Sequence, residues 1–479
     1  MTTPSNNTGN EIWRWTATEI AHRVRTGAIS AREAVQSSLD RIAETNPTLN
    51  AIVELSSDEA LKAADQADRM VKGGDELGPL HGVPVTIKMN TDQAGHATVD
   101  GVPAFKDAVV DADSPQVKSL RDAGGIMVGR TNTPAFSLRW FANNDVYGRT
   151  LSPWNKAHTP GGSSGGASSS VAAGMVPISH GNDIGGSIRY PAYACGIYGL
   201  RPTVGRVSGW VGPAEADQSL SFQSMWVQGP IARSVSDLRL GLQAMAKPDP
   251  RDPWFAPAPL SGAPLRRPIK VGVVRGEEIV KLHPGVAQAI DKAAGWLKDA
   301  GYQVEEIRVP AFEEAYKLWY LLCIEELRSE VPFMHKEGDD GIRGVFNTYF
   351  AAAQQWWPEK PTLEDYMKGY ARRGTLIAQV QKIFQEYPIL LLPISAEPPF
   401  EQDADYLDIN RGIEVIRANW GAMAIPMLSL PGISAPVHVH NGLPCGVQMI
   451  GPKFREDILL SAGEVLEART EVRTPIDPR

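Results

Sequence analysis

The sequence predicts an α/β protein built on one large, mostly parallel β-sheet that is covered by helices. Short β-rich runs at residues 82–88, 126–131 and 175–181 alternate with helical segments. This alternation favours parallel pairing with helices on both faces of a sheet. Strand-like runs also follow the Pro-rich stretch 248–268. Because open sheets of roughly eight to fifteen strands occur in large α/β enzymes, we expect the 479 residues to form one domain.

The first part of the chain predicts helices over residues 16–55 and 57–72. Each of the first two helical runs begins with a Ser or Thr followed three residues later by Glu, at Thr16 and Ser30. This spacing is the capping box, which satisfies free N–H groups at a helix start. Pro47 is expected to stop the second helix, because the residue before a proline is driven away from helical geometry.

The remaining elements follow from apolar runs and turn residues. In chain order we expect a strand at 269–274, a helix at 284–299, a strand at 302–309, a mainly helical stretch at 311–386, strands at 388–393, 427–431 and 445–450, a turn at Asn441-Gly442, and a helix at 457–469. The first three of these form a βαβ unit. The expected organisation of the domain 1–479 is N-terminal helices (1–75), a core half (76–247), a surface connection (248–268), and a second half (269–479) with the helical insert 311–386.

Composition excludes several function classes. The net charge is −8, with 55 acidic and 47 basic residues, so nothing predicts a nucleic-acid partner. No apolar stretch is long enough to span a bilayer, and the polar N-terminus lacks the pattern of a secretory signal. The three cysteines are widely spaced, which favours buried free thiols. We therefore expect a cytoplasmic protein without a membrane partner.

Residues 161–166, GGSSGG, do not fit the two usual roles of glycine-rich segments. No lysine follows the glycines as a phosphate-binding P-loop requires. A flexible linker is also disfavoured, because the stretch lies between Pro160 and an apolar run rather than in polar sequence. The glycines are expected to permit tight turns that hold Ser163 and Ser164 inside the fold.

A second loop, GNDIGGSIRYP at 181–191, places two glycines before Ser187. Consecutive backbone N–H groups there could stabilise an oxyanion beside the Ser187 hydroxyl, although Gly-Gly-Ser is more often only a turn. A serine nucleophile needs a base, and the residues alone leave two candidates. His180 with Asp183 is one, and His180 is equally well a core histidine. Lys88 is the other: it ends a buried-type strand, where burial would lower its pKa, unless its amine reaches water.

A metal site is not predicted. His438 and His440 alternate along a strand, but no third ligand is spaced with them.

Four segments resemble the amidase signature family. They are Lys88 after GVPVTI, the block 160–203, GPIARSVSDL at 229–238 and GLPCGVQMIGP at 442–452. The resemblance extends over nearly the whole chain. It implies a single large domain with a central twisted, mixed, mostly parallel β-sheet flanked by helices.

The resemblance also implies a Ser–cis-Ser–Lys triad and a need for neither metal nor organic cofactor. Ser187 would be the nucleophile that carries an acyl-enzyme, Ser163 the bridging serine after a cis peptide bond, and Lys88 the base. The remaining implied residues are the backbone N–H groups of Ile184, Gly185, Gly186 and Ser187 as the oxyanion hole, Asp183 and Arg189 as its structural support, and Ser137 and Asn182 as substrate contacts. Asn182 departs from the family, which often has Thr at that position.

The implied reaction is hydrolysis of a carboxamide or carbamate C–N bond, with esters as easier substrates. Similarity to bacterial aryl acylamidases and urethanases favours small apolar or aryl substrates. The variable segments 137–145, 206–227 and 311–386 are expected to build the pocket. They contain the aromatic residues Trp140, Phe141, Trp210, Trp226, Trp319, Tyr320, Trp356 and Trp357.

Two alternative functions remain open. One is the amidotransferase A-type subunit, which works with partner proteins. The other is a non-catalytic binding protein on the same scaffold, which predicts loss of a triad residue, and none is lost in this sequence. A homodimer is expected only because twofold assemblies are common.

Overall fold

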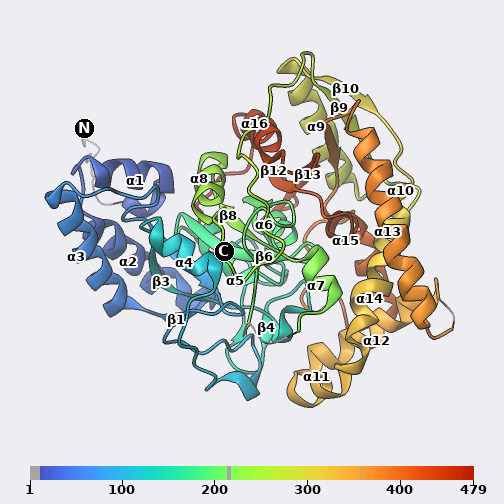
Figure 1. Ribbon diagram of the computed structural model, residues 1–479, viewed down its shortest axis with the longest axis horizontal. Coiled ribbons are helices and arrows are strands. Elements are labelled where there is room, and N and C mark those ends of the chain that lie inside the picture. Colours follow the sequence, from blue (N-terminus) through green and yellow to red (C-terminus); the bar gives the residue numbers. More distant parts are fainter. Residues whose placement is uncertain (1–10, 213–216, 358) are drawn as a thin grey trace.

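The computed structural model describes residues 11–212, 217–357 and 359–479. Within these ranges one eleven-stranded β-sheet runs through the molecule (Figure 1). In sheet order its strands are β1 (Ile52–Leu55), β3 (Ile126–Thr131), β2 (Pro84–Lys88), β6 (Ile178–Asp183), β8 (Val227–Ala232), β7 (Tyr198–Arg201), β12 (Gly432–His440), β13 (Leu443–Ile450), β11 (Ile389–Leu392), β9 (Lys270–Val273) and β10 (Gln303–Glu306). A separate short pair is formed by β4 (Asn143–Asn144) and β5 (Gly148–Arg149).

Helices account for most of the remaining regular structure. The α-helices are α1 (Ala17–Arg25), α2 (Ala31–Leu49), α3 (Ser57–Gly73), α4 (Pro115–Asp122), α5 (Gly165–Ala172), α6 (Arg189–Cys195), α7 (Leu220–Met225), α8 (Val235–Met245), α9 (Pro284–Asp299), α10 (Ala311–Trp319), α11 (Val331–Glu337), α12 (Asp340–Gln354), α13 (Leu363–Ile383), α14 (Ile409–Ala418), α15 (Trp420–Met427) and α16 (Glu456–Glu467). Shorter turns of helix are η1 (Ile12–Arg14), η2 (Pro103–Phe105), η3 (Ala135–Ser137), η4 (Tyr320–Ile324) and η5 (Glu326–Ser329).

The α/β class with a mixed sheet flanked by helices is confirmed. Strand β2 pairs in parallel with β3 and β6, and β9 pairs in parallel with β10 and β11. The strands between these two groups, from β6 through β8, β7, β12 and β13 to β11, pair antiparallel, as β1 does with β3. Parallel pairing therefore occurs on both flanks, where helices connect successive strands, and the centre is antiparallel.

The sheet continues across the Pro-rich segment of the sequence. Strand β7, which precedes residues 248–268, pairs with β12, which follows them. The described segment 248–268 itself contains no helix or strand. This continuity supports the proposal that residues 1–479 form one domain.

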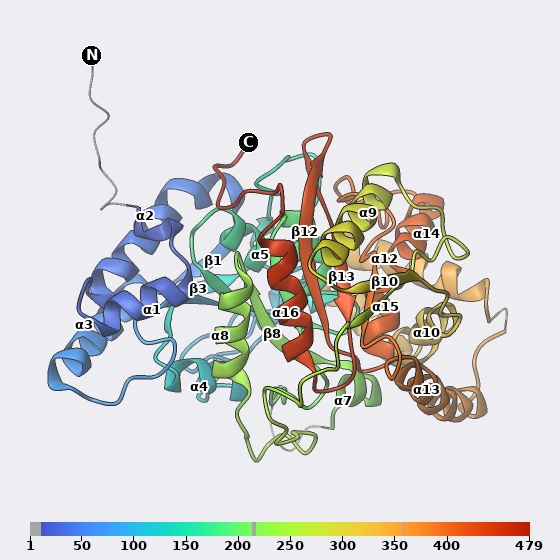
Figure 2. The same cartoon turned by 90° about the horizontal axis from the view of Figure 1, so that it is seen from above.

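Helices cover both faces of the sheet (Figures 1 and 2). Helices α8, α9 and α16 pack on one face, against β8, β13 and β12, and α5 and α6 pack on the other. Helices α1–α3 lie at one end of the molecule, and the helices of the insert 311–386 lie at the opposite end (Figure 1). The hydrophobic core therefore consists of two parts, one between each face of the sheet and the helices that cover it.

The predicted helix stop at Pro47 is wrong. Helix α2 passes through Pro47 and ends at Leu49, because Asn50 adopts a left-handed φ of 50° and donates its N–H to the Asn46 carbonyl. The Asn46 side chain accepts the next two backbone N–H groups, those of Ala51 and Ile52. Side-chain capping thus fixes the helix end. Strand β1 follows directly, inside a region that was expected to be helical.

The predicted strand at 427–431 is also wrong. Met427 ends helix α15, Ser429 turns the chain with a φ of 54°, and strand β12 begins only at Gly432. A short apolar run does not distinguish a buried strand from a buried helix, and α15 is buried on all sides. The turn at Asn441-Gly442 is confirmed, with positive φ at both residues.

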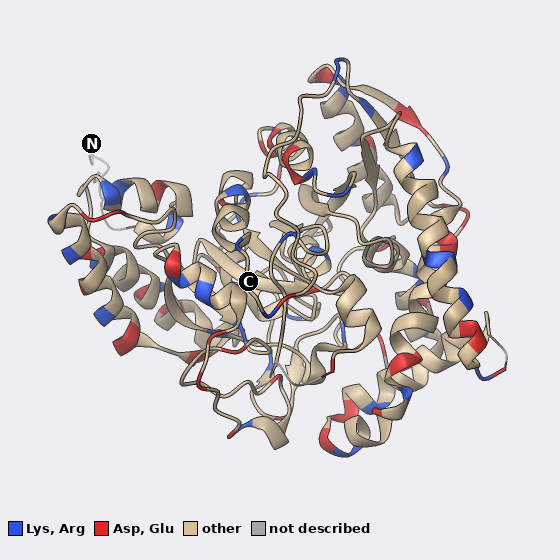
Figure 3. Ribbon diagram, viewed as in Figure 1, with Lys and Arg blue, Asp and Glu red and all other residues tan. Residues whose placement is uncertain are grey.

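The placement of the charged residues and of the cysteines agrees with what the composition predicts. In Figure 3 the outer helices α3 and α13 carry both acidic and basic residues. Cys195, Cys323 and Cys445 are buried and unpaired, as expected. In the part of the chain that the structure describes, no helix combines the length and the apolar character needed to cross a membrane.

Candidate active site

The sheet brings the candidate catalytic residues to one edge. Lys88 is at the end of β2 and Asp183 ends the parallel neighbour β6, and ligands of α/β proteins bind at the carboxyl ends of such strands. Ser163 precedes helix α5 and Ser187 precedes α6. The two serine loops are joined by a hydrogen bond from the Ser164 N–H to the Ser187 carbonyl at 3.3 Å.

The Lys88 amine lies in the interior rather than in solvent. Its side chain is fully buried, and Nζ donates to Ser163 Oγ at 2.5 Å and to Asn182 Oδ1 at 2.7 Å. Burial lowers the pKa of Lys88 to about 7, against the opposing charges of Asp100 and Asp183. Burial therefore favours the neutral amine of this lysine, the form that can accept a proton.

Ser163 lies within the glycine-rich segment 161–166, and Ser187 directly follows Gly185 and Gly186. The Gly162–Ser163 peptide bond is cis. Ser187 is 7% exposed and lines a cavity. Lys88 contacts Ser163 directly, whereas no hydrogen bond joins the hydroxyls of Ser163 and Ser187 within the described residues. Catalytic hydrogen bonds often tighten only in the substrate complex.

Three backbone N–H groups at the loop before α6 point to no acceptor in the described chain. They belong to Ile184, Gly185 and Ser187, whereas the Gly186 N–H donates to Asp183 Oδ1 at 3.0 Å. A Cβ atom at Gly186, where φ is 100°, would lie 2.6 Å from the Cβ atom of Ala422. The sequence Ile-Gly-Gly-Ser thus exposes backbone donors that a larger residue at this position would displace.

Two tryptophans hold the carbonyl groups of the same loop. The Trp319 indole N–H donates to the Ile184 carbonyl at 2.8 Å, and the Trp140 indole N–H donates to the Gly185 carbonyl at 2.9 Å. A carbonyl and the N–H of the following residue belong to one rigid peptide plane. The tryptophans therefore orient the N–H groups of Gly185 and Gly186. The sequence indicated both as pocket residues, but not this contact.

We expect Trp319→Phe to lower kcat by about fivefold, because a hydrogen bond of this kind contributes about 1 kcal/mol. The phenyl ring keeps most of the packing and removes only the donor to the loop. Trp226→Phe is the matched control, since its indole lines the same cavity but its N–H has no hydrogen-bond partner in the described chain. Steady-state kinetics should show a smaller loss of kcat for Trp226→Phe, and equal losses would contradict an orienting role for Trp319.

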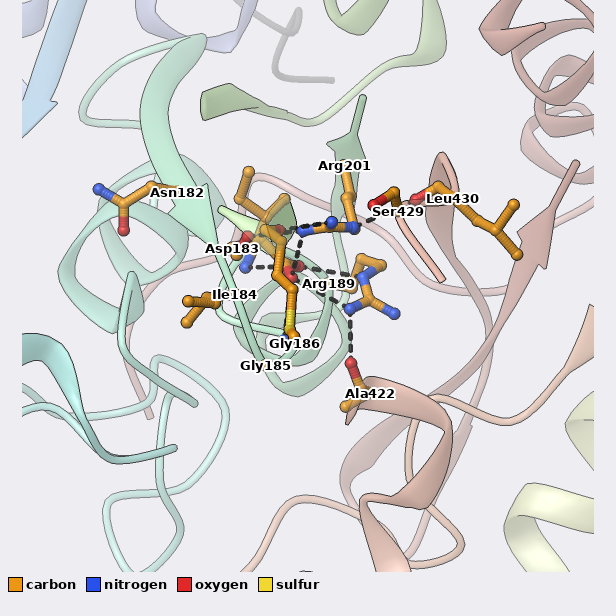
Figure 4. A network of polar contacts seen from close by, with 12 residues as sticks. Asn182, Asp183, Ile184, Gly185, Gly186, Arg189, Arg201, Ala422, Ser429 and Leu430 are labelled. Atoms are coloured by element: carbon orange, nitrogen blue, oxygen red, sulfur yellow. Dashed lines mark hydrogen bonds and ion pairs between the residues drawn. The ribbon is translucent and has the colours of Figure 1, made fainter. Parts of the chain in front are cut away.

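Asp183 fixes the start of the loop 184–187 through contacts with two arginines. Arg189 donates to both carboxylate oxygens at 3.0 and 3.1 Å, and Arg201 donates to Oδ1 at 3.1 Å (Figure 4). Burial alone would raise the pKa of Asp183, but the charges of Arg189 and Arg201 outweigh it and hold that pKa at about 2. Arg189 also donates to the Ala422 carbonyl at 2.6 Å and to Gln448 Oε1 at 2.8 Å. The network ties the Ser187 loop to the second half of the chain.

The cavity beside Ser187 has a volume of about 180 Å³. All three variable segments expected to form the pocket contribute to it. Its apolar wall consists of Phe136, Leu138, Trp140, Ile184, Val211, Phe222, Trp226, Trp319, Cys323, Ile324, Leu327 and Tyr349. A cavity of about 150 Å³ accommodates benzene, so this one has room for a small aryl group.

Several expected site residues lie elsewhere or act differently. His180 Nε2 bonds to Gln228 Oε1 at 2.8 Å, and burial lowers its pKa to about 4. It is a core histidine, because Asp183 is occupied by the arginines. Asn182, expected at the substrate, is fully buried and bonds to Lys88 and Asn90. Trp356 and Trp357 face a different surface groove. Ser137 does line the cavity.

Two polar residues of the site were not predicted from the sequence. Asn90, two residues after Lys88, and Asp100, in an Asp-Gly pair, both line the cavity. An Asp-Gly pair is a turn signal, and nothing local in the sequence distinguishes this turn from one on the surface.

The comparisons with known proteins agree with the fold. The family model described as Amidase matches residues 33–460. Indoleacetamide hydrolase of Bradyrhizobium diazoefficiens is 42% identical over 96% of this chain and 87% of its own length. The A-type subunit of the glutamyl-tRNA(Gln) amidotransferase of Deinococcus radiodurans is 32% identical over 95% of this chain and 97% of its own. A bacterial aryl acylamidase structure has a TM-score of 0.78 at 26% identity, covering 95% of this chain and 96% of that one.

A buried lysine amine thus contacts a serine hydroxyl at the carboxyl ends of parallel strands. The chain belongs to the amidase signature family. It is an amide-cleaving hydrolase.

Proposed function

We propose that the protein hydrolyses the primary amide of a small arylacetic acid through an acyl-enzyme on Ser187. The contact that carries this proposal is the 2.5 Å hydrogen bond from the buried Lys88 amine to Ser163, beside a cavity that Ser187 shares with an aromatic wall.

The first half of the reaction uses the three residues as a proton relay. Neutral Lys88 takes a proton from Ser163, Ser163 takes the proton of Ser187, and Ser187 Oγ attacks the substrate carbonyl carbon. The negative charge that develops on the carbonyl oxygen is stabilised by the backbone N–H groups of Ile184, Gly185 and Ser187, with Gly186 shared with Asp183. Each such donor can contribute about 10²–10³ in rate.

The second half returns the protons. Ser163 donates to the leaving nitrogen as the C–N bond breaks, and ammonia departs. The relay then takes a proton from water, which attacks the acyl-enzyme and releases the acid. Each step needs only this chain, the substrate and water.

The substrate class is supported by the size and walls of the cavity and by the relatives. The 42% identical relative is named as an indoleacetamide hydrolase, and a 26% identical structure is of an aryl acylamidase. Anilides and carbamates are the alternatives within the same chemistry. The amidotransferase function is the less favoured alternative, because a wall built mainly of apolar and aromatic side chains suits an aryl group better than the polar groups of glutamine.

A substrate panel tests this proposal. We expect arylacetamides such as indole-3-acetamide to have a kcat/KM at least tenfold above those of anilides, aryl carbamates, short aliphatic amides and glutamine, as measured by release of ammonia or amine. A preference for short aliphatic amides would contradict the aryl pocket. Glutaminase activity that requires a co-purifying partner would favour the amidotransferase function.

A further inference from the structure

The polar end of the cavity contains a carboxylate that the proposed mechanism does not use. Asp100 lines the cavity together with Asn90, Ser137 and Ser187. Its Oδ1 atom accepts a hydrogen bond from Ser137 Oγ at 2.6 Å. Within the described residues its second oxygen has no hydrogen-bond partner. That oxygen is free to accept a hydrogen bond from a ligand or from water.

The other charged groups near the site are engaged in ion pairs or hydrogen bonds, except that Nη1 of Arg139 has no partner in the described chain. Arg139 also lines the cavity, but its guanidinium donates to Asp405 at 2.8 and 2.7 Å and to Asp403 at 2.8 Å. Lys88 donates to Ser163 and Asn182 rather than to Asp100, and Asp183 is held by arginines. Burial raises the pKa of Asp100 to about 7, against its hydrogen bond from Ser137 and the charge of Lys88.

A directed chain of hydrogen bonds ends at Asp100. Lys88 Nζ donates to Asn182 Oδ1 at 2.7 Å, and Asn182 Nδ2 donates to Asn90 Oδ1 at 2.7 Å. Asn90 Nδ2 donates to Ser137 Oγ at 2.9 Å, and Ser137 Oγ donates to Asp100 at 2.6 Å. Because the Ser137 hydroxyl proton is used within the chain, this end of the cavity offers acceptors. A substrate atom placed there must therefore be a donor.

This chain of hydrogen bonds also indicates which part of the substrate lies at the polar end of the cavity. It begins at Lys88, the residue bonded to Ser163, which returns the proton to the leaving nitrogen. Most of the other residues that line the cavity are apolar and suit the acyl group. The leaving group is therefore the part of the substrate that faces the polar end.

We propose that Asp100 is a specificity-determining residue that accepts a hydrogen bond from the N–H of an unsubstituted carboxamide, so that the enzyme selects primary amides over N-substituted amides and esters. This inference rests on the proposed function. When the C–N bond breaks, the proton on the leaving nitrogen comes from Ser163, and Asp100 takes none. Its hydrogen bond is kept as the nitrogen becomes ammonia. An ester has no donor at the corresponding oxygen, and an N-alkyl group would place carbon against the carboxylate.

The test compares three substrates with one acyl group: the primary arylacetamide, its N-methyl amide and its methyl ester. We expect Asp100→Ala to lower kcat/KM for the primary amide by about 10- to 100-fold, as for loss of a hydrogen bond to a charged group. The loss for the ester should stay below about threefold, in keeping with the absence of a donor. Asp100→Asn, which keeps a neutral acceptor, should recover part of the primary-amide activity.

The pattern across substrates decides the proposal. Equal losses on the amide and the ester would show that Asp100 acts on the catalytic machinery and would overturn it, as would unchanged amide selectivity in both variants. Labelling of Ser187 by a fluorophosphonate and the thermal unfolding midpoint verify an intact site, and if Asp100→Ala does not fold, Asp100→Asn decides alone. Failure of the proposed function is a separate outcome, because it would appear as wild-type enzyme that does not label at Ser187 or does not hydrolyse the primary arylacetamide.

Discussion

Ser187→Ala is expected to abolish turnover of every amide and ester substrate. Removal of the nucleophile from a serine triad lowers kcat by about 10⁶-fold, because the attacking atom is lost and the other residues act only through it. The measurement is steady-state kinetics on an arylacetamide and its ester, together with mass spectrometry of the enzyme after rapid quenching. Wild-type enzyme should accumulate an acyl adduct on Ser187, and the variant should show none.

The fold of this variant should be unchanged, because the substitution removes one hydroxyl that makes no hydrogen bond within the described chain. Its thermal unfolding midpoint should stay within a few degrees of wild type. Ser164→Ala, in the glycine-rich segment 161–166, is a control that should keep its activity. Ser164 is fully buried, and its hydroxyl contacts the Asn182 carbonyl rather than the cavity. Residual activity of Ser187→Ala above about a hundredth of wild type would identify a different nucleophile.

Lys88→Met is expected to lower kcat/KM by about 10²–10⁴-fold, the usual contribution of a positioned general base. Methionine keeps the volume of the buried side chain and removes the amine that contacts Ser163. Lys88→Arg should be similarly inactive, because a guanidinium keeps its proton at every accessible pH. An active arginine variant would show that the residue supplies positive charge and not a proton acceptor.

The pH profile of the wild type tests the same role. Burial lowers the pKa of Lys88 to about 7, so the fraction of neutral amine falls about tenfold for each unit of pH below that value. kcat/KM should therefore decrease toward acid with an inflection near pH 7. The pKa of Asp100 is also about 7, so the inflection belongs to the interacting pair. A flat profile between about pH 5 and 8 would contradict Lys88 as the base.

The sequence predicted much of the fold because its signals are local. The pattern at Ser30 and Glu33 indicated the start of α2, and the turn at Asn441-Gly442 indicated the hairpin between β12 and β13. The errors arose where a local signal was outweighed by its surroundings. Pro47 lies inside α2 because Asn46 and Asn50 complete the helix end beyond it.

For the site, too, some residues could be predicted from local sequence and others could not. Lys88, Ser163 and Ser187 were recognisable from the segments around them, and the structure joins the first two directly. The family resemblance implies that Asn182 contacts the substrate, whereas in the structure its side chain accepts a hydrogen bond from the buried Lys88 amine. Its side chain points away from the arginines around Asp183 (Figure 4).

The sequence by itself determined the family, the helix caps, the glycine turns and the residues able to carry a serine–lysine reaction, because residue type and spacing along the chain encode these directly. Only the tertiary structure decided that Trp319 orients the loop before Ser187 and that Asp100 faces the cavity. These residues lie 135 positions from the Ile184 carbonyl and 37 positions from Ser137, respectively. Contacts across such separations depend on how sheet and helices pack, which no local pattern specifies.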